Sequence, residues 1–232
     1  MKLQKETESI TRDSHGKWYG DACGTAFAME LIGERWSLLI IRELMLGGRR
    51  FSDLRGSLPG ISAKVLTERL AGLEQAGVLL RRRLPPPAAS QVYELTEWGY
   101  LAEVAIQELG RWAARSPGHD ATLPLSPVSF MLSMRTMLDK EAAGRLKLTL
   151  GFDTGGEQFV GRLEDGTLPI AREDIVAADV VFRCHTPMEL AALFYGKMPL
   201  DEWAAGEGRA IEGDRVLAER FVDLFWLPEK VG

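Results

Sequence analysis

A proline-rich segment divides this 232-residue chain. Residues 115–129 read RSPGHDATLPLSPVS, and their three prolines, their glycine and their small polar residues separate two regions of regular hydrophobic periodicity. Each region is long enough to bury a core of its own. We therefore expect two domains, at residues 1–116 and 129–232, joined by a linker at residues 117–128.

The region before the linker predicts mainly helices. Apolar residues recur at helical spacing over residues 24–46, where Gly33 marks a break between two helices. A short helix is expected at residues 51–57. After a turn, Ser62 is a good N-cap for a helix that runs to about Ala76.

A hairpin and a last helix complete this region. The strand-like stretches at residues 78–84 and 91–96 are joined by the proline-rich PPPAAS. One helix is then expected over residues 98–115, with a single apolar stripe wide enough to pack against a partner. The stripe consists of Trp98, Leu101, Ala105, Leu109 and Trp112.

Basic residues gather on the predicted turn, capped helix and hairpin. Residues 49–83 hold eight Lys and Arg against three Asp and Glu, a net charge of +5, although the whole chain carries −5. A helix that can enter the major groove, followed by a basic hairpin that can lie along the DNA backbone, is typical of a winged helix-turn-helix that binds double-stranded DNA. A solvated basic face is the alternative for any single arginine. The candidate contacts are Arg49, Arg50, Arg55, Ser62, Lys64, Thr67, Arg69, Arg81, Arg82 and Arg83.

Several segments in this order resemble the HxlR family of winged-helix regulators over residues 23–115. They are LIGERWSLLIIREL, RRFSDL, LPGIS, KVLTERL and LTEWG. The resemblance implies a homodimer built through the N- and C-terminal helices of this domain. It places recognition on the helix around Lys64, Thr67 and Arg69, and the stripe assigns dimerisation to Trp98, Leu101, Leu109 and Trp112.

Two cysteines lie far apart in the sequence, and they suggest neither a disulfide framework nor a metal pair. Cys23 occupies a position where many members of the HxlR family have a cysteine, and a thiol near a helix N-terminus can have a lowered pKa. It is a candidate redox residue, and the alternative is a small buried hydrophobe. With a polar N-terminus and no membrane-length apolar run, the sequence predicts a cytoplasmic protein without a membrane partner.

The region after the linker predicts an α+β domain. A helix precedes RLKLTLGF, EQFVGRL, TLPIAR and ADVVFRCH, which indicate a sheet of four or five strands, and helices follow. The segment from ADVVFRCH to RFVDLF resembles a sterol-carrier-protein domain, which implies a tunnel for an apolar or lipid-like effector. Candidate ligand contacts are Phe152, Phe194, Trp203 and Phe225, with core packing as the alternative.

Catalysis finds little support in the sequence. The three histidines, His15, His119 and His185, are scattered, and no HExxH, GxSxG or GxxxxGK motif occurs. We therefore expect no catalytic residues, no metal and no cofactor. The main hypothesis is a dimeric DNA-binding regulator that responds to an apolar ligand. The alternative is a lipid-binding or sequestering protein that uses its winged helix for dimerisation or protein contact.

Overall fold

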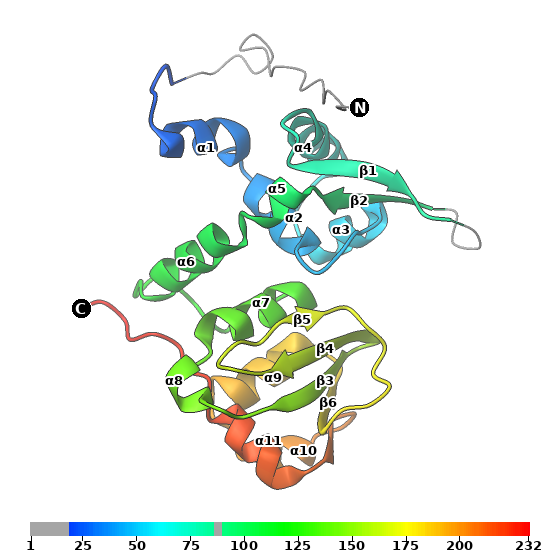
Figure 1. Cartoon of the computed structure of the whole chain (residues 1–232), viewed down its shortest axis with the longest axis vertical. Helices are drawn as coiled ribbons and strands as arrows, with labels where there is room; N and C mark the ends of the chain where they lie inside the picture. Colours follow the sequence, from blue (N-terminus) through cyan, green and yellow to red (C-terminus); the bar gives the residue numbers. More distant parts are fainter. Residues whose placement is uncertain (1–18, 86–89) are drawn as a thin grey trace, which may run out of the picture. The chain divides into compact units, whose positions relative to one another are not determined.

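The computed structural model describes residues 19–85 and 90–232 (Figure 1). These residues form two compact units. The first contains residues 19–41 and 48–100, and the second contains residues 42–47 and 101–232.

Helices and one hairpin make up the first unit. Its elements are α1 (Gly24–Ile32), the start of α2 (Ser37–Leu44), α3 (Phe51–Ser57), α4 (Ala63–Gln75), β1 (Leu79–Arg83), β2 (Gln91–Leu95) and α5 (Glu97–Tyr100). The expected break near Gly33 and the expected start of the capped helix are confirmed. Ser62 caps α4, because its Oγ accepts a hydrogen bond from the Val65 amide at 3.2 Å.

The hairpin is a two-stranded antiparallel ribbon in which Leu79 pairs with Leu95 and Arg83 with Gln91. Arg49 adds a short bridge to it, since the backbone amides and carbonyls of Arg49 and Tyr93 exchange hydrogen bonds of 2.9 and 2.8 Å. The tip predicted from PPPAAS lies mostly outside the described residues, at 86–89. The order of α3, turn, α4 and hairpin is that of a winged helix-turn-helix.

The prediction of one helix over residues 98–115 is wrong. Two helices, α5 and α6 (Glu103–Ala114), stand there, separated by a turn at Leu101 and Ala102. Gly99 holds α5 against the hairpin, because a Cβ at this position would lie 2.1 Å from the Val78 carbonyl oxygen. The turn follows directly, and α6 belongs to the second unit.

The second unit is an α+β arrangement around a mixed sheet. Besides α6, its elements are α7 (Pro127–Met137), α8 (Lys140–Ala143), β3 (Leu148–Thr154), β4 (Glu157–Leu163), β5 (Ile170–Ala171), β6 (Val180–Cys184), α9 (Pro187–Phe194), α10 (Leu200–Ala204), β7 (Ala210–Gly213) and α11 (Arg215–Val222). The sheet order is β5-β4-β3-β6-β7, with β3 and β6 parallel and the other pairs antiparallel. The strand β7 was not predicted, because it is short and its side chains are half-buried or exposed.

An aromatic core lies between the sheet and its helices. Phe152 and Phe182 stack on neighbouring strands, with ring centroids 5.8 Å apart. Phe194 of α9 and Phe221 of α11 contact both rings, and Trp203 of α10 contacts Phe182. Strand alternation places charged groups on the opposite face, where the Arg183 guanidinium pairs with Asp153 at 2.9 Å and with Glu212 at 2.7 Å.

The two units divide the chain at a different place from the expected linker. Residues 117–126 contain no helix or strand, but the division falls between Tyr100 and Leu101. The reason is that α6 packs on α7 (Figure 1), and the periodicity of α6 does not reveal which helix will cover it. Within residues 19–85 and 90–232, no helix is both long and apolar enough to cross a membrane.

Candidate nucleic-acid interface

The outward face of α4 carries polar side chains. Leu66, Leu70 and Leu73 are at most 1% exposed and anchor the helix. The Lys64 side chain is 86% exposed, and its nearest carboxylate, on Glu68, lies 3.9 Å away. Thr67 is exposed, and its hydroxyl donates to the Ala63 carbonyl at 2.9 Å, so its oxygen can still accept a hydrogen bond. Lys64 and Thr67 are therefore both exposed on the outward face of α4, and their contact with bases stays a prediction.

Two of the arginines predicted to contact DNA form hydrogen bonds within the first unit. Arg69 donates from Nε to the Arg35 carbonyl at 3.1 Å and from Nη2 to Glu34 at 3.0 Å. Arg49 is 8% exposed and donates from Nη2 to Ser57 Oγ at 3.1 Å. The Arg69 contacts join α4 to the connection between α1 and α2, and the Arg49 contact joins the segment before α3 to the C-terminal end of that helix. Their geometry fits a structural role better than the expected phosphate contact.

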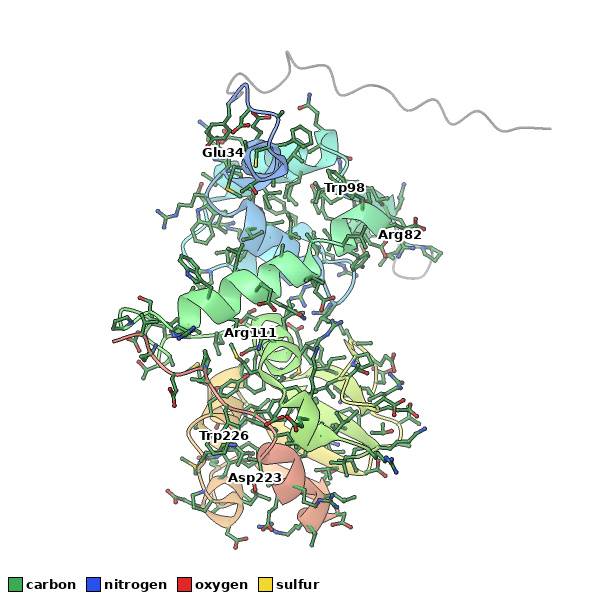
Figure 2. The ribbon with its side chains drawn as sticks, turned by 60° about the vertical axis from the view of Figure 1, so that its left-hand side comes forward. Glu34, Arg82, Trp98, Arg111, Asp223 and Trp226 are labelled. Atoms are coloured by element: carbon green, nitrogen blue, oxygen red, sulfur yellow. The ribbon has the colours of Figure 1, made fainter. Side chains whose placement is uncertain are left out.

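The hairpin carries three consecutive exposed arginines on β1. Arg81 donates from Nε to both carboxylate oxygens of Glu74 on α4, at 2.9 and 2.8 Å, and this hydrogen bonding raises the pKa of Arg81. Arg82 pairs with Glu94 of the opposite strand at 2.8 Å and is labelled on the hairpin in Figure 2. Arg83 follows next to the tip. Because side chains alternate along a strand, Arg81 and Arg83 share one face and Arg82 takes the other.

Three further predicted contacts lie around α3 and at the start of α4. Arg50 is exposed and donates from Nε to Ser90 Oγ at 3.0 Å, which joins the start of α3 to the end of the hairpin. Arg55 is exposed on α3. Ser62 keeps its hydroxyl hydrogen for a further acceptor, because its oxygen is the group that accepts from Val65.

Both cysteines are free thiols. Cys23 is exposed at the N-cap of α1, so the alternative reading of a buried hydrophobe does not fit. The backbone N–H of Ala26, and then that of Thr25, stabilise its thiolate and lower its pKa. Cys184 is buried, and loss of hydration raises its pKa to about 12. Among the described residues, no three His, Cys, Asp or Glu side chains gather where they could hold a metal ion.

The predicted dimerisation residues are exposed on α5, on the turn that follows it and on α6. Trp98 is 48% exposed on α5, in the first unit. In the second unit, Leu101 is 75%, Leu109 44% and Trp112 74% exposed. Val104, which is 69% exposed, extends this stripe and was missed, although its position three residues after Leu101 is a sufficient signal.

The four predicted ligand contacts, Phe152, Phe194, Trp203 and Phe225, are 0% exposed and pack into the aromatic core. A cavity of about 860 Å³ lies elsewhere in the second unit, and none of the four lines it. Its walls come from α6, residues 118–125, α7, α9 and the segment after α9. Sequence reasoning missed this cavity because its lining residues are scattered over the chain. The role of the four aromatic residues in ligand binding stays a prediction.

Comparison with known proteins agrees with the winged helix-turn-helix. Residues 31–120 match the model of the family described as HxlR-like helix-turn-helix. The HTH-type transcriptional regulator YodB of Bacillus subtilis is 42% identical over 86 residues, which cover 37% of this chain and 77% of YodB. YvaP of the same organism, an uncharacterized HTH-type transcriptional regulator, is 36% identical over 37% of this chain and 80% of its own.

A solved structure of the reduced form of YodB covers 43% of this chain and 100% of its own, with 37% identity and a TM-score of 0.39. From the extent and identity of the match to YodB, the chain belongs to the HxlR-like helix-turn-helix family.

Proposed function

We propose that this protein is a dimeric transcriptional regulator that binds a specific DNA sequence in the cytoplasm. One observation carries the proposal: α4 begins at a capped N-terminus and presents Lys64 and Thr67 outward from a firmly buried apolar stripe. A rigid helix with polar groups in its first two turns suits the major groove. The relatives YodB and YvaP are HTH-type transcriptional regulators, which supports the same role.

The roles of the basic residues follow from their surroundings. Lys64 and Thr67 are suited to base edges, whereas Arg50, Arg55, Arg82 and Arg83 are suited to phosphates, because they are exposed around α4 and along the hairpin. Phosphate contacts supply affinity for any duplex, and base contacts supply the preference for one sequence. The proposal therefore separates residues that set specificity from residues that set affinity.

The test compares the gene's own upstream DNA with a random duplex of equal length by fluorescence anisotropy. We expect Lys64→Ala to weaken binding to the specific duplex by about five- to 150-fold, from the loss of about 1–3 kcal/mol of base discrimination, with less effect on random DNA. Arg83→Ala is expected to weaken both and to lower the salt slope by about one. Lys147→Ala is the control, because Lys147 is an exposed lysine of the second unit that pairs with Glu164.

Equal affinity of the native protein for both duplexes would contradict the proposal. It would favour the second candidate, a lipid-binding or sequestering protein whose winged helix serves dimerisation. The resemblance of the C-terminal region to a sterol-carrier domain motivates that candidate and also the proposal of an apolar effector. The mixed sheet with helices on its aromatic face is compatible with both.

The exposed stripe of α6 supports the dimer. Large apolar side chains that share one helix face and remain exposed in a protomer mark an interface. A two-fold symmetric dimer reads two half-sites, whose expected spacing is about 34 Å, one turn of the duplex, or a multiple of it. The operator is then expected to be an inverted repeat.

Cys23 supports a second level of control by oxidants or electrophiles. Its thiol is exposed, and its pKa is lowered by backbone N–H groups at the start of α1. We expect N-ethylmaleimide, which adds to a single thiolate and takes up its own proton from water, to change operator affinity in the native protein and to leave the affinity of Cys23→Ser unchanged. An identical response of both proteins would exclude Cys23 as the sensor.

A further inference from the structure

The cavity of the second unit has the size and the walls of a small-molecule site. Its volume of about 860 Å³ lies within the range of about 300–1,000 Å³ that is typical of such sites. Apolar side chains of α6, α7 and α9 form most of the walls, among them Ile106, Leu132, Met137, Met188 and Ala191. An apolar ligand can therefore bury part of its surface against these side chains.

Two charged side chains of the cavity, Arg42 and Asp120, already have hydrogen-bond partners. Arg42 donates from Nε and Nη2 to the fully buried Glu43 at 3.0 and 2.8 Å. At the rim, the Asp120 carboxylate accepts from the Thr122 amide and hydroxyl, at 2.9 and 2.6 Å. Arg42 therefore offers no unbalanced charge to an acidic ligand, and Asp120 disfavours one. The mostly apolar walls favour a neutral molecule, because burying a charge among them costs free energy.

Two hydroxyl groups in the wall can orient such a molecule. Ser133 Oγ and the Tyr195 hydroxyl lie 2.7 Å apart and share one hydrogen bond. Whichever group donates, the other keeps its own hydrogen for an acceptor in the cavity. Burial raises the pKa of Tyr195, so its hydroxyl stays protonated. This neutral donor beside apolar walls suits a carbonyl, ether or hydroxyl oxygen on a hydrophobic ligand.

The helix α6 is fastened near both ends. Towards its N-terminus, Glu103 Oε1 accepts from Arg135 of α7 at 2.9 Å and from Gln107 at 2.8 Å. At its C-terminus, the Lys230 ammonium donates to the Ala114 carbonyl at 3.0 Å, and the Val231 amide donates to the Arg115 carbonyl at 2.8 Å. Between these attachments, α6 forms one wall of the cavity.

The cavity and the exposed stripe lie on opposite faces of α6. Ile106, Gln107, Gly110 and Ala114 line the cavity. At about 100° per residue, these residues point roughly half a turn away from the exposed residues Val104, Ala105, Leu109 and Trp112. A ligand that shifts or stiffens α6 from the cavity side therefore acts directly on the proposed dimer interface.

We infer that this cavity binds a neutral hydrophobic molecule with one hydrogen-bond acceptor, and that its occupancy changes dimer strength through α6. The second part rests on the proposed function, because it requires the dimer. Linkage makes the effect reciprocal: a ligand that strengthens the dimer by a given factor is itself bound more tightly by the dimer.

Nile red is the probe, since it is neutral, hydrophobic, bears a carbonyl oxygen and fluoresces in apolar surroundings. We expect saturable binding of one dye per protomer of the full-length protein. Gly110→Phe fills the cavity from α6, and a Cβ at Gly110 meets no atom within 4 Å, so the first atom of the new side chain is accommodated. It is expected to weaken dye binding at least tenfold. The matched control is Ala113→Phe, on an exposed position of α6 outside the cavity, with less than a twofold effect.

The dimer dissociation constant, measured by sedimentation, is expected to change at least fivefold at saturating Nile red in the native protein and in Ala113→Phe, but not in Gly110→Phe. Dye binding by Gly110→Phe at native affinity would overturn the site. An unchanged dimer constant in the dye-saturated native protein would overturn the coupling. If circular dichroism shows that Gly110→Phe is unfolded, Ala192→Phe fills the cavity from α9 and decides the same question.

DNA binding without dye separates this inference from the proposed function. If the native protein binds its upstream DNA specifically and Gly110→Phe leaves the dye affinity unchanged, the cavity site is overturned and the proposed function stands. If the cavity variants weaken dye binding and the native protein does not prefer its upstream DNA, the result supports the site and contradicts the proposed function.

Discussion

Replacing Leu109 with aspartate tests the proposed dimer most directly. Leu109 is 44% exposed on the outer face of α6. Burial of a whole leucine side chain contributes about 1.5–3 kcal/mol, so covering the exposed part contributes about 1 kcal/mol per protomer and about 2 kcal/mol per symmetric dimer. The new carboxylate must also lose water or take up a proton, which costs several kcal/mol for the pair. We expect the dimer dissociation constant to rise by about a thousandfold or more.

Sedimentation equilibrium measures this change, and circular dichroism checks that the variant is folded. Leu109→Ala removes only the apolar contact and is expected to raise the dissociation constant about ten- to thirtyfold. Val176→Asp is the control for an added surface charge, because Val176 is 91% exposed outside the α6 stripe. A folded Leu109→Asp protein that dimerises as strongly as the native protein would refute the reasoning and place the interface elsewhere, with α1 as the next candidate.

Three further predictions concern single side chains. Arg69→Ala is expected to lower the free energy of unfolding by about 1–3 kcal/mol in urea titrations, because it removes two hydrogen bonds, whereas Lys64→Ala should change it by less than about 0.5 kcal/mol. Ser62→Ala is expected to cost about 1 kcal/mol in the same assay, from the loss of the α4 cap, and a cost near zero would contradict the capping role. Burial raises the pKa of Cys184 from 9.0 to about 12, so the unfolded thiol ionises first and its contribution to stability is expected to fall between about pH 9 and pH 12. The difference in unfolding free energy between the native protein and Cys184→Ala, followed over that range, measures this contribution, and a difference that stays constant would contradict the prediction.

Local sequence signals predicted the winged helix-turn-helix well. The polar residue before an apolar periodic run predicted the start of α4, and the strand-like stretch at residues 78–84 predicted β1. These elements are governed by contacts between residues that are close in sequence, such as Ser62 with Val65. For that reason their existence and order could be inferred without a structure.

The roles of individual arginines were harder to infer. Arg69 and Lys64 look equally suitable as DNA contacts in the sequence, but Arg69 binds Glu34 and the Arg35 carbonyl while the Lys64 side chain remains 86% exposed. Glu34 and Arg69 are 35 residues apart in the chain. Only the folded chain shows which basic side chain finds a partner at such a separation.

The sequence by itself determined the helix-turn-helix, the local basic charge and the apolar stripe of residues 98–112, because periodicity, capping and composition are properties of neighbouring residues. The tertiary structure decided that α6 starts after a separate α5, that it packs on α7, and that the predicted aromatic contacts fill a core. It also decided where the cavity of the second unit lies. A cavity is the space left between side chains that lie far apart in the chain, so no local pattern records it.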